Sequence, residues 1–239
     1  MRVLKWILGS WVAALVFCLC VVKCRAQSAP FVRVYHDAFV SYYDQQTHNP
    51  AMVVYLLEAR HFSGSYRMAG RHFKADTQLP RPRVLDKDFS NTGYVRGHLC
   101  SAGDRDSDKG WLKETYLTSN LVPMTMVCNS GLWKVIEDSC RTLALHGHRL
   151  LLVRGPMYYE SNGPTLNVVQ ARPVIQVPDA FFCFGKCQDC GQTLSLSCKN
   201  VGTNVLQVVL HYQRDERISM LLTKILGIWS REEYEIITR

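Results

Sequence analysis

The first 26 residues constrain the chain strongly, because they set the compartment in which the rest folds. Lys5 precedes an uncharged run from Trp6 to Val22, and Lys23-Cys24-Arg25-Ala26 follows. This order predicts a signal peptide cut after Ala26. An uncleaved N-terminal anchor at residues 6–22 and a lipoprotein are the alternatives, since the run is just long enough to span a bilayer. Under all three interpretations, residues 27–239 are exported to the periplasm or the extracellular space, with no other membrane association.

Seven of the ten cysteines follow this segment: Cys100, Cys128, Cys140, Cys183, Cys187, Cys190 and Cys198. Disulfides are the default in an oxidising compartment, and an odd number leaves at least one cysteine outside an intrachain pair. The last four fall within 16 residues, so a structural zinc site at Cys183, Cys187, Cys190 and Cys198 is the alternative to disulfides, which we favour. His146 and His148 have a spacing that could chelate a metal, but a solvated turn is the preferred interpretation.

Composition excludes a disordered or fibrous chain, because 47% of the 239 residues are hydrophobic and 20% are charged. This length supports one sizeable core, and we expect a single domain at residues 27–239. Of the net charge of +8, four units belong to Arg2, Lys5, Lys23 and Arg25, which leaves +4 for the domain. That excess permits an anionic partner such as nucleic acid but does not require one.

Strand and helix patterns alternate irregularly along the domain. Apolar and β-branched runs predict strands over 51–62, 66–73, 150–153, 174–177, 180–184 and 205–212. Apolar residues at helical spacing predict a helix over 129–145 and a second one over 218–226. Pro80 and Pro82 mark a loop. The pattern indicates an α+β domain.

Two segments carry residues that suit one reaction. Gly93-Tyr94-Val95-Arg96-Gly97-His98-Leu99 is the first, and Asn120-Leu121-Val122-Pro123 followed by Asn129-x3-Trp133-x3-Glu137-x3-Arg141 is the second. On a continuous helix Asn129 and Glu137 differ by about 80° and can face one site. An amide oxygen with a carboxylate suits Mg²⁺, a neutral imidazole accepts a proton near neutral pH, and guanidinium groups bind phosphate. Together these groups suit metal-assisted attack of water on a phosphodiester.

Some of these side chains also have structural interpretations. Trp133 is expected to pack in the core rather than to stack on a base. Arg141 could act as a cation near the C-terminal end of the helix, and Glu137 could simply pair with Arg141 at the i,i+4 spacing.

These motifs, with Arg71-His72-Phe73-Lys74-Ala75-Asp76 upstream, resemble the signature of the DNA/RNA non-specific endonucleases, which are secreted ββα-metal (His-Me finger) nucleases with the motif D-R-G-H. The resemblance covers about residues 51–184. It implies a central, mainly antiparallel sheet flanked by helices, and hydrolysis of DNA and RNA that are held through their phosphates. The Cys-rich and C-terminal region 185–239 departs from the family and could form a homodimer surface or a specificity element.

The resemblance also assigns roles residue by residue. His98 would be the general base, Asn129 the protein ligand of one Mg²⁺, with Mn²⁺ as a substitute ion, and Glu137 would orient the waters of the metal. The remaining roles fall to Arg71 and Arg141, which would neutralise phosphate charge, to Arg96, which would hold the phosphate or the loop, and to Asn120, which would support the geometry of the site.

One position departs from the family motif. Val95 stands where the family has Asp, a carboxylate that helps hold the water shell of the metal. Asp104 or Asp106 could compensate. The alternatives to a nuclease are therefore an exported nucleic-acid-binding protein with impaired catalysis on the same scaffold, and a hydrolase of another phosphodiester. Cys100 and Cys128, close to His98 and Asn129, are expected to form a disulfide across the site.

Overall fold

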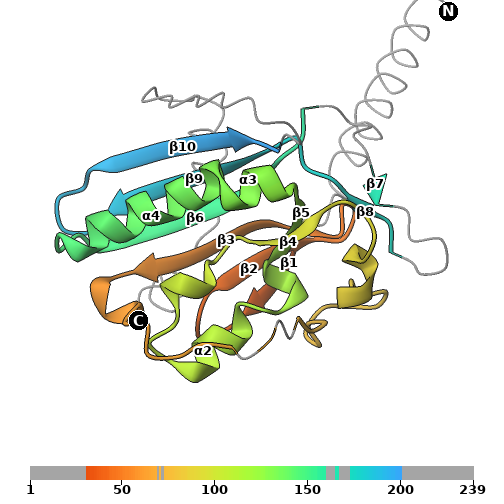
Figure 1. Ribbon diagram of the computed structural model, residues 1–239, viewed down its shortest axis with the longest axis horizontal. Helices are drawn as coiled ribbons and strands as arrows, with labels where there is room; N and C mark the ends of the chain where they lie inside the picture. The colour runs from red at the N-terminus through yellow and green to blue at the C-terminus, as the bar shows by residue number, and fades with distance from the viewer. Residues whose placement is uncertain (1–30, 69, 71–72, 160–164, 167–172, 201–239) are drawn as a thin grey trace, which may run out of the picture. The chain divides into compact units, whose positions relative to one another are not determined.

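The computed structural model describes residues 31–68, 70, 73–159, 165–166 and 173–200 (Figure 1). These residues belong to one compact unit, which begins at Phe31. The expected signal peptide or anchor, Arg71, the strand at 205–212, the helix at 218–226 and most of the expected dimer surface lie outside the described residues. Within the described ranges, no helix is long and apolar enough to cross a membrane.

A six-stranded antiparallel sheet forms the centre of the unit. Its strands run in the order β1-β2-β3-β6-β9-β10, with β1 at Phe31–Tyr35, β2 at Val40–Asp44, β3 at Asn49–Leu57, β6 at Leu150–Met157, β9 at Ala180–Cys187 and β10 at Thr193–Lys199. The central strands β3 and β6 are apolar almost throughout because both of their faces are buried. The expected α+β class with a mainly antiparallel sheet is confirmed.

Two expectations about the strands over 51–62 and 66–73 are wrong. The segment 66–73 forms no strand where it is described, and β3 gives way to a 3-10 helix at Ala59–His61. The backbone N–H of Tyr66 donates instead to the carbonyl of Asp106. The partners of β3 are β2 and the distant β6, a choice that periodicity within one segment cannot show.

A smaller hairpin lies on the same face of the sheet as the helices (Figure 1). It pairs β4, Val95–His98, with β5, Leu121–Met124. Between these strands come a 3-10 helix at Ala102–Asp104, α2 at Lys109–Glu114 and a 3-10 helix at Thr118–Asn120. Other short elements are the 3-10 helix Asp86–Phe89 and the strand pair of β7, Thr165–Leu166, with β8, Ile175–Gln176. The segment between β4 and β5 thus folds back over the sheet.

The single helix expected over 129–145 is divided in two. Helix α3 covers Met126–Ser130 and α4 covers Leu132–Leu145. The backbone turns at Gly131, where a Cβ atom would lie only 2.5 Å from the carbonyl oxygen of Val127. Only glycine fits this close approach, so the angular argument from one continuous helix is wrong.

Helix α4 packs its apolar face on the sheet. Trp133, Ile136, Cys140 and Ala144 recur at helical spacing and are all buried. The Trp133 ring lies 5.6 Å from the Phe181 ring of β9, centroid to centroid. The prediction that Trp133 belongs to the core is confirmed.

The four clustered cysteines do not converge, so the four-cysteine zinc site, which was the alternative to the favoured disulfides, is wrong. Cys183 faces Cys140 of α4 with 3.9 Å between the sulfurs, and Cys198 faces Cys128 of α3 with 3.6 Å. Cys187 lies four residues along β9 from Cys183, about 13 Å away at the rise of a strand. The expected Cys100–Cys128 disulfide is not formed, since the Cys128 sulfur is turned toward that of Cys198.

Candidate active site

The β4–β5 hairpin holds His98 at its end. Gly97 precedes His98 on β4, and a Cβ atom there would lie 2.7 and 2.8 Å from two side-chain atoms of Met124 on β5. The two strands can therefore come this close only with glycine at position 97. This explains physically why a glycine stands directly before the histidine.

Aromatic side chains fix the orientation of His98. The indole Nε1–H of Trp133 donates to the carbonyl of His98 at 3.0 Å. The imidazole ring meets Tyr116 edge-on, with centroids 5.0 Å apart, and lies 5.7 Å from the Phe73 ring. A base held on several sides is already oriented before substrate arrives.

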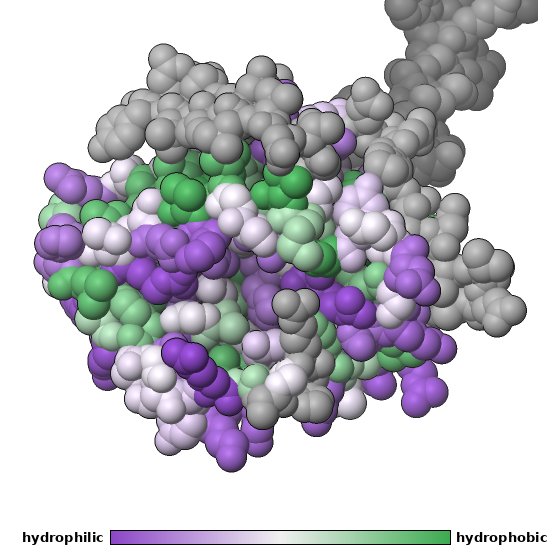
Figure 2. All heavy atoms as spheres, in the orientation of Figure 1, coloured by the Kyte–Doolittle hydropathy of each residue, from purple (hydrophilic) through white to green (hydrophobic). Residues whose placement is uncertain are grey.

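One pocket brings together four of the residues singled out by the sequence. His98, Asn129, Glu137 and Arg141 line a cavity of about 330 Å³, together with Ser101, Ala102, Gly103, Ser130 and Lys134. In this orientation hydrophilic side chains gather in a band just below α4 (Figure 2). The hairpin, α3 and α4 thus contribute to the same site, although α3 and α4 are separate helices.

The donor set of this pocket fits a hard divalent cation. Asn129 offers an amide oxygen, and Glu137 offers a carboxylate from the next helix. Burial raises the pKa of Glu137 to about 7, with Arg154, Arg141 and a Ser101 hydrogen bond acting in the opposite direction. A carboxylate that is costly to ionise without a cation is suited to receive one.

A buried charge network lies beneath the pocket. Asp104 is fully buried and accepts hydrogen bonds from Tyr55 Oη at 2.6 Å, from Arg141 Nη1 at 2.6 Å and from Arg154 Nη1 at 3.3 Å. Arg154 is also fully buried, over the rings of Tyr55 and Trp133. Buried cations require such partners. The network joins β3 and β6 to α4, which carries Glu137.

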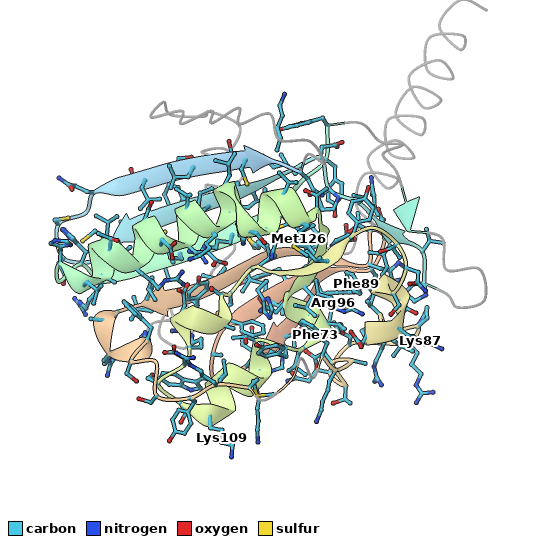
Figure 3. All side chains as sticks on the ribbon, in the orientation of Figure 1. Phe73, Lys87, Phe89, Arg96, Lys109 and Met126 are labelled. Atoms are coloured by element: carbon cyan, nitrogen blue, oxygen red, sulfur yellow. The ribbon has the colours of Figure 1, made fainter. Side chains whose placement is uncertain are left out.

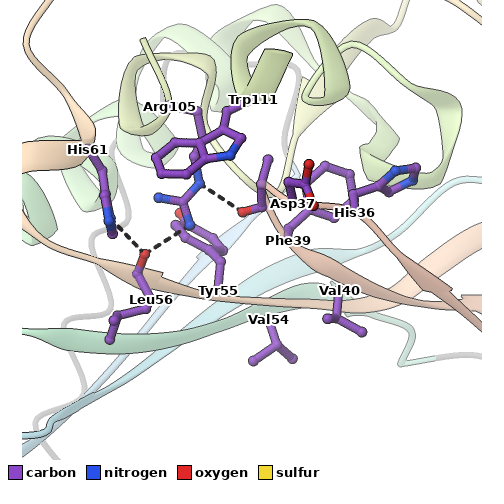
Figure 4. Close-up of a pocket in the computed structure, with 11 residues that line it drawn as sticks. His36, Asp37, Phe39, Val40, Val54, Tyr55, Leu56, His61, Arg105 and Trp111 are labelled. Carbon is purple, nitrogen blue, oxygen red and sulfur yellow. Dashed lines mark hydrogen bonds between the residues drawn. The ribbon is translucent and has the colours of Figure 1, made fainter. Parts of the chain in front are cut away.

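Arg105 anchors the loop that carries Asp104. Figure 4 shows its guanidinium between Trp111 and Tyr55, with hydrogen bonds to main-chain carbonyls of β3 and of the segment before β2. Nε donates to the carbonyl of Ala38 at 2.7 Å, and Nη2 donates to that of Leu56 at 2.8 Å. The small cavity around Arg105 is lined by residues that bond to one another, and these bonds hold the loop on the sheet.

Arg96 and Asn120 lie outside the lining of the pocket. Arg96 pairs with Asp86 and lies between the Phe73 and Phe89 rings (Figure 3), at 5.4 and 5.5 Å from their centroids. Arg96 was expected to hold either the phosphate or the loop, and these contacts correspond to holding the loop.

Asn120 is fully buried and braces the chain after His98. Its side chain accepts from the N–H of Cys100 at 2.7 Å and donates to the carbonyls of Cys100 and Thr115. Arg71 lies outside the described residues.

Neither Asp104 nor Asp106 takes the place of the missing motif carboxylate. Both oxygens of Asp104 are engaged by the buried network. Asp106 accepts from the N–H of Gly64 at 2.8 Å and is not part of the pocket lining. Val95 is half-buried and packs against the main core.

Three contributors to the site were missed in the sequence. Lys134 lies three residues before Glu137 and seven before Arg141, which is the spacing of one helix face, and this signal was available. Arg154 interrupts an apolar strand, which indicates a buried cation in need of a carboxylate. The hydroxyl of Tyr55 comes from the distant strand β3 and left no such signal, and Asp104 was considered only as a substitute for the missing motif carboxylate, not as the partner of Arg154.

The fold agrees with comparisons against known proteins. Residues 19–213 match the model of the DNA/RNA non-specific endonuclease family, and the chain belongs to this family. Structurally it is similar to a chain in the crystal structure of the EndoG/EndoGI complex, with a TM-score of 0.64, 21% identity and coverage of 85% of this chain and 88% of that one. The expected ββα-metal fold is confirmed.

Individual relatives are similar over part of their length. The mitochondrial nuclease EXOG of Danio rerio is 30% identical over 126 residues, which are 52% of this chain and 36% of that protein. The mitochondrial nuclease of Saccharomyces cerevisiae is 30% identical over 158 residues, 61% of this chain and 47% of that protein. The chain spans about a third of the length of the EXOG relatives it matches.

Proposed function

We propose that this protein is a Mg²⁺-dependent endonuclease that hydrolyses phosphodiester bonds of DNA and RNA with little sequence preference. The observation that carries the proposal is the convergence of His98, Asn129, Glu137 and Arg141 on one pocket. Membership of the nuclease family supports it.

The pocket residues divide the work of hydrolysis. His98 takes a proton from the attacking water onto its imidazole. Glu137 accepts hydrogen bonds from water and so orients it. Lys134 and Arg141 oppose the negative charge that grows on the phosphate. Mg²⁺ held by the amide oxygen of Asn129 would supply further neutralisation of the phosphate oxygens. Contacts of this kind go to the backbone of the nucleic acid, which explains weak preference for sequence.

The test is cutting of supercoiled plasmid and of single-stranded RNA by the full chain, with Mg²⁺, with Mn²⁺ or with EDTA. We expect metal-dependent cutting of both polymers that His98→Ala abolishes. His146→Ala is the matched control, because this exposed histidine donates to Thr142 of its own helix, away from the pocket. Salt-sensitive binding without cutting, by folded protein, would refute the proposal and favour the binding protein. Cutting of a small phosphodiester but of neither polymer would favour the other hydrolase.

Val95 provides a direct comparison between the nuclease and the binding protein. Introducing the family carboxylate as Val95→Asp should lower the Mg²⁺ concentration for half-maximal cutting, by about 10-fold or more if it holds metal-bound water. Under our proposal the unchanged chain already cuts. A chain that cuts only after this substitution is the impaired protein of the alternative.

We further propose that the protein is exported and carries two disulfides, Cys128–Cys198 and Cys140–Cys183. The segment before residue 27 supports export, and the sulfur separations of 3.6 and 3.9 Å support the pairing. Closure needs the sulfurs to approach by less than about 2 Å. Non-reducing peptide mapping of secreted protein should find both linked pairs and an N-terminus at Gln27. Free thiols at these four positions would exclude the pairing.

A further inference from the structure

Three metal-ligating side chains meet away from the active-site pocket. His148 lies in the loop between α4 and β6, Cys187 is the last residue of β9, and Cys190 lies in the β9–β10 turn. The turn and the C-terminal end of α4 lie at the same end of the molecule (Figure 1). Their ligand atoms all lie within 4.8 Å of one another, and His148 Nδ1 is 3.4 Å from the Cys187 sulfur. The proposed nuclease reaction uses none of these groups.

The turn itself has a geometry suited to thiolate ligands. Its sequence is Cys187-Gln188-Asp189-Cys190-Gly191, and the N–H of Cys190 donates to the Cys187 sulfur at 3.4 Å. Gly191 has a φ of 72°, a conformation that favours glycine, and its N–H donates to the carbonyl of Cys187. The main-chain N–H of Cys190 is thus already directed at the sulfur that would bind an ion.

The two loops are also joined without any ion. The main-chain N–H and the Nε of Arg149 donate to the Asp189 carboxylate at 3.0 and 2.8 Å. The N–H of Gln188 donates to the carbonyl of Arg149 at 2.8 Å. These bonds place His148 beside the turn, so the three ligands are arranged in advance. The carboxylate of Asp189 is occupied by Arg149 and is not a fourth ligand.

We propose that His148, Cys187 and Cys190 bind one Zn²⁺ ion. Tetrahedral zinc with its usual bond lengths separates a nitrogen and a sulfur ligand by about 3.6 Å and two sulfurs by about 3.8 Å. The 3.4 Å between His148 Nδ1 and the Cys187 sulfur is close to the first value, and all three ligand atoms lie within 4.8 Å of one another. Thiolates select zinc over Mg²⁺, so this ion is distinct from the one expected at Asn129. Three protein ligands leave the fourth position to water. The bound ion ties the β9–β10 turn to the loop after α4 and stabilises both.

The first test measures zinc in the full chain by mass spectrometry, after exposure to Zn²⁺ and dialysis into chelator-free buffer with excess Mg²⁺. We expect one zinc per chain. His148→Ala and Cys190→Ser should reduce it to background, whereas His146→Ala should retain it, because the ring of His146 in the same loop is bonded to Thr142. Asn129→Ala should retain it too, since that residue lines the other pocket.

Spectroscopy and unfolding provide readouts that do not depend on nuclease activity. Co²⁺ in place of zinc should show thiolate-to-metal charge-transfer absorption that Cys190→Ser loses, and zinc should raise the melting temperature of the unchanged chain only. Folded wild-type protein without zinc would overturn the proposal, as would zinc that persists in His148→Ala and Cys190→Ser. A Cys187–Cys190 disulfide in peptide maps of the purified protein would overturn it as well.

Discussion

Removing the charge of Asp104 should cost the protein much of its stability. The carboxylate accepts from Tyr55, Arg141 and Arg154, and both Asp104 and Arg154 are fully buried. Asp104→Asn keeps the volume but leaves the buried cation of Arg154 uncompensated. Loss of one partner in a buried ion pair costs about 3 to 5 kcal/mol, which for a domain of this size lowers the melting temperature by about 6 to 20 °C.

Urea denaturation and thermal unfolding, followed by circular dichroism, measure this cost directly. Asp106→Asn is the matched control, because Asp106 lies two residues away and its carboxylate, among the described residues, accepts from the main-chain N–H of Gly64 and pairs with no buried cation. We expect the control to lose about 1 kcal/mol or less. If Asp104→Asn is no more destabilising than Asp106→Asn, the buried network does not hold the fold as argued, and the arginines have other compensation.

Other substitutions test further parts of the structure. Gly97→Ala forces a Cβ atom against Met124 and should destabilise the protein by about 1 to 3 kcal/mol, measured by urea denaturation, while lowering plasmid cutting. An unchanged urea midpoint would contradict the close approach of β4 and β5. Asp76 is largely buried, which raises its pKa, but hydrogen bonds led by that from His36 outweigh burial and lower it. Its contribution to stability is therefore present above about pH 4 and is lost as the pH falls through the lowered value. The urea midpoint of Asp76→Asn should thus fall less steeply with acid than that of the unchanged chain, and parallel curves would count against this.

Residues whose chemistry depends on local spacing could be predicted from the sequence. His98 and Asn129 belong to short motifs, and Glu137 and Arg141 follow along α4, so their meeting in one pocket was expected. The division of the helix at Gly131 was not, because a steric contact with Val127 decides it. Periodicity shows that a helix forms but not where a backbone contact interrupts it.

The orientation of side chains and their contacts with residues distant in the sequence were harder to predict. Arg96 has the residue type for phosphate binding, yet its contacts are with Asp86 and two phenylalanine rings. The spacing of the clustered cysteines suggested one common site, but in the fold Cys183 lies beside Cys140 and Cys198 lies beside Cys128. Only the packing of the sheet against the helices decides which side chains meet.

The pairing of β3 with β6 has a consequence for how the protein folds. Its register joins Val53 to Arg154 and Leu57 to Leu150, two stretches separated by nearly a hundred residues of chain. The whole pocket, from His98 to Arg141, lies inside the loop that this pairing closes. Closing so long a loop is entropically costly and slow. Nuclease activity should therefore appear late in refolding, together with the joining of the two central strands.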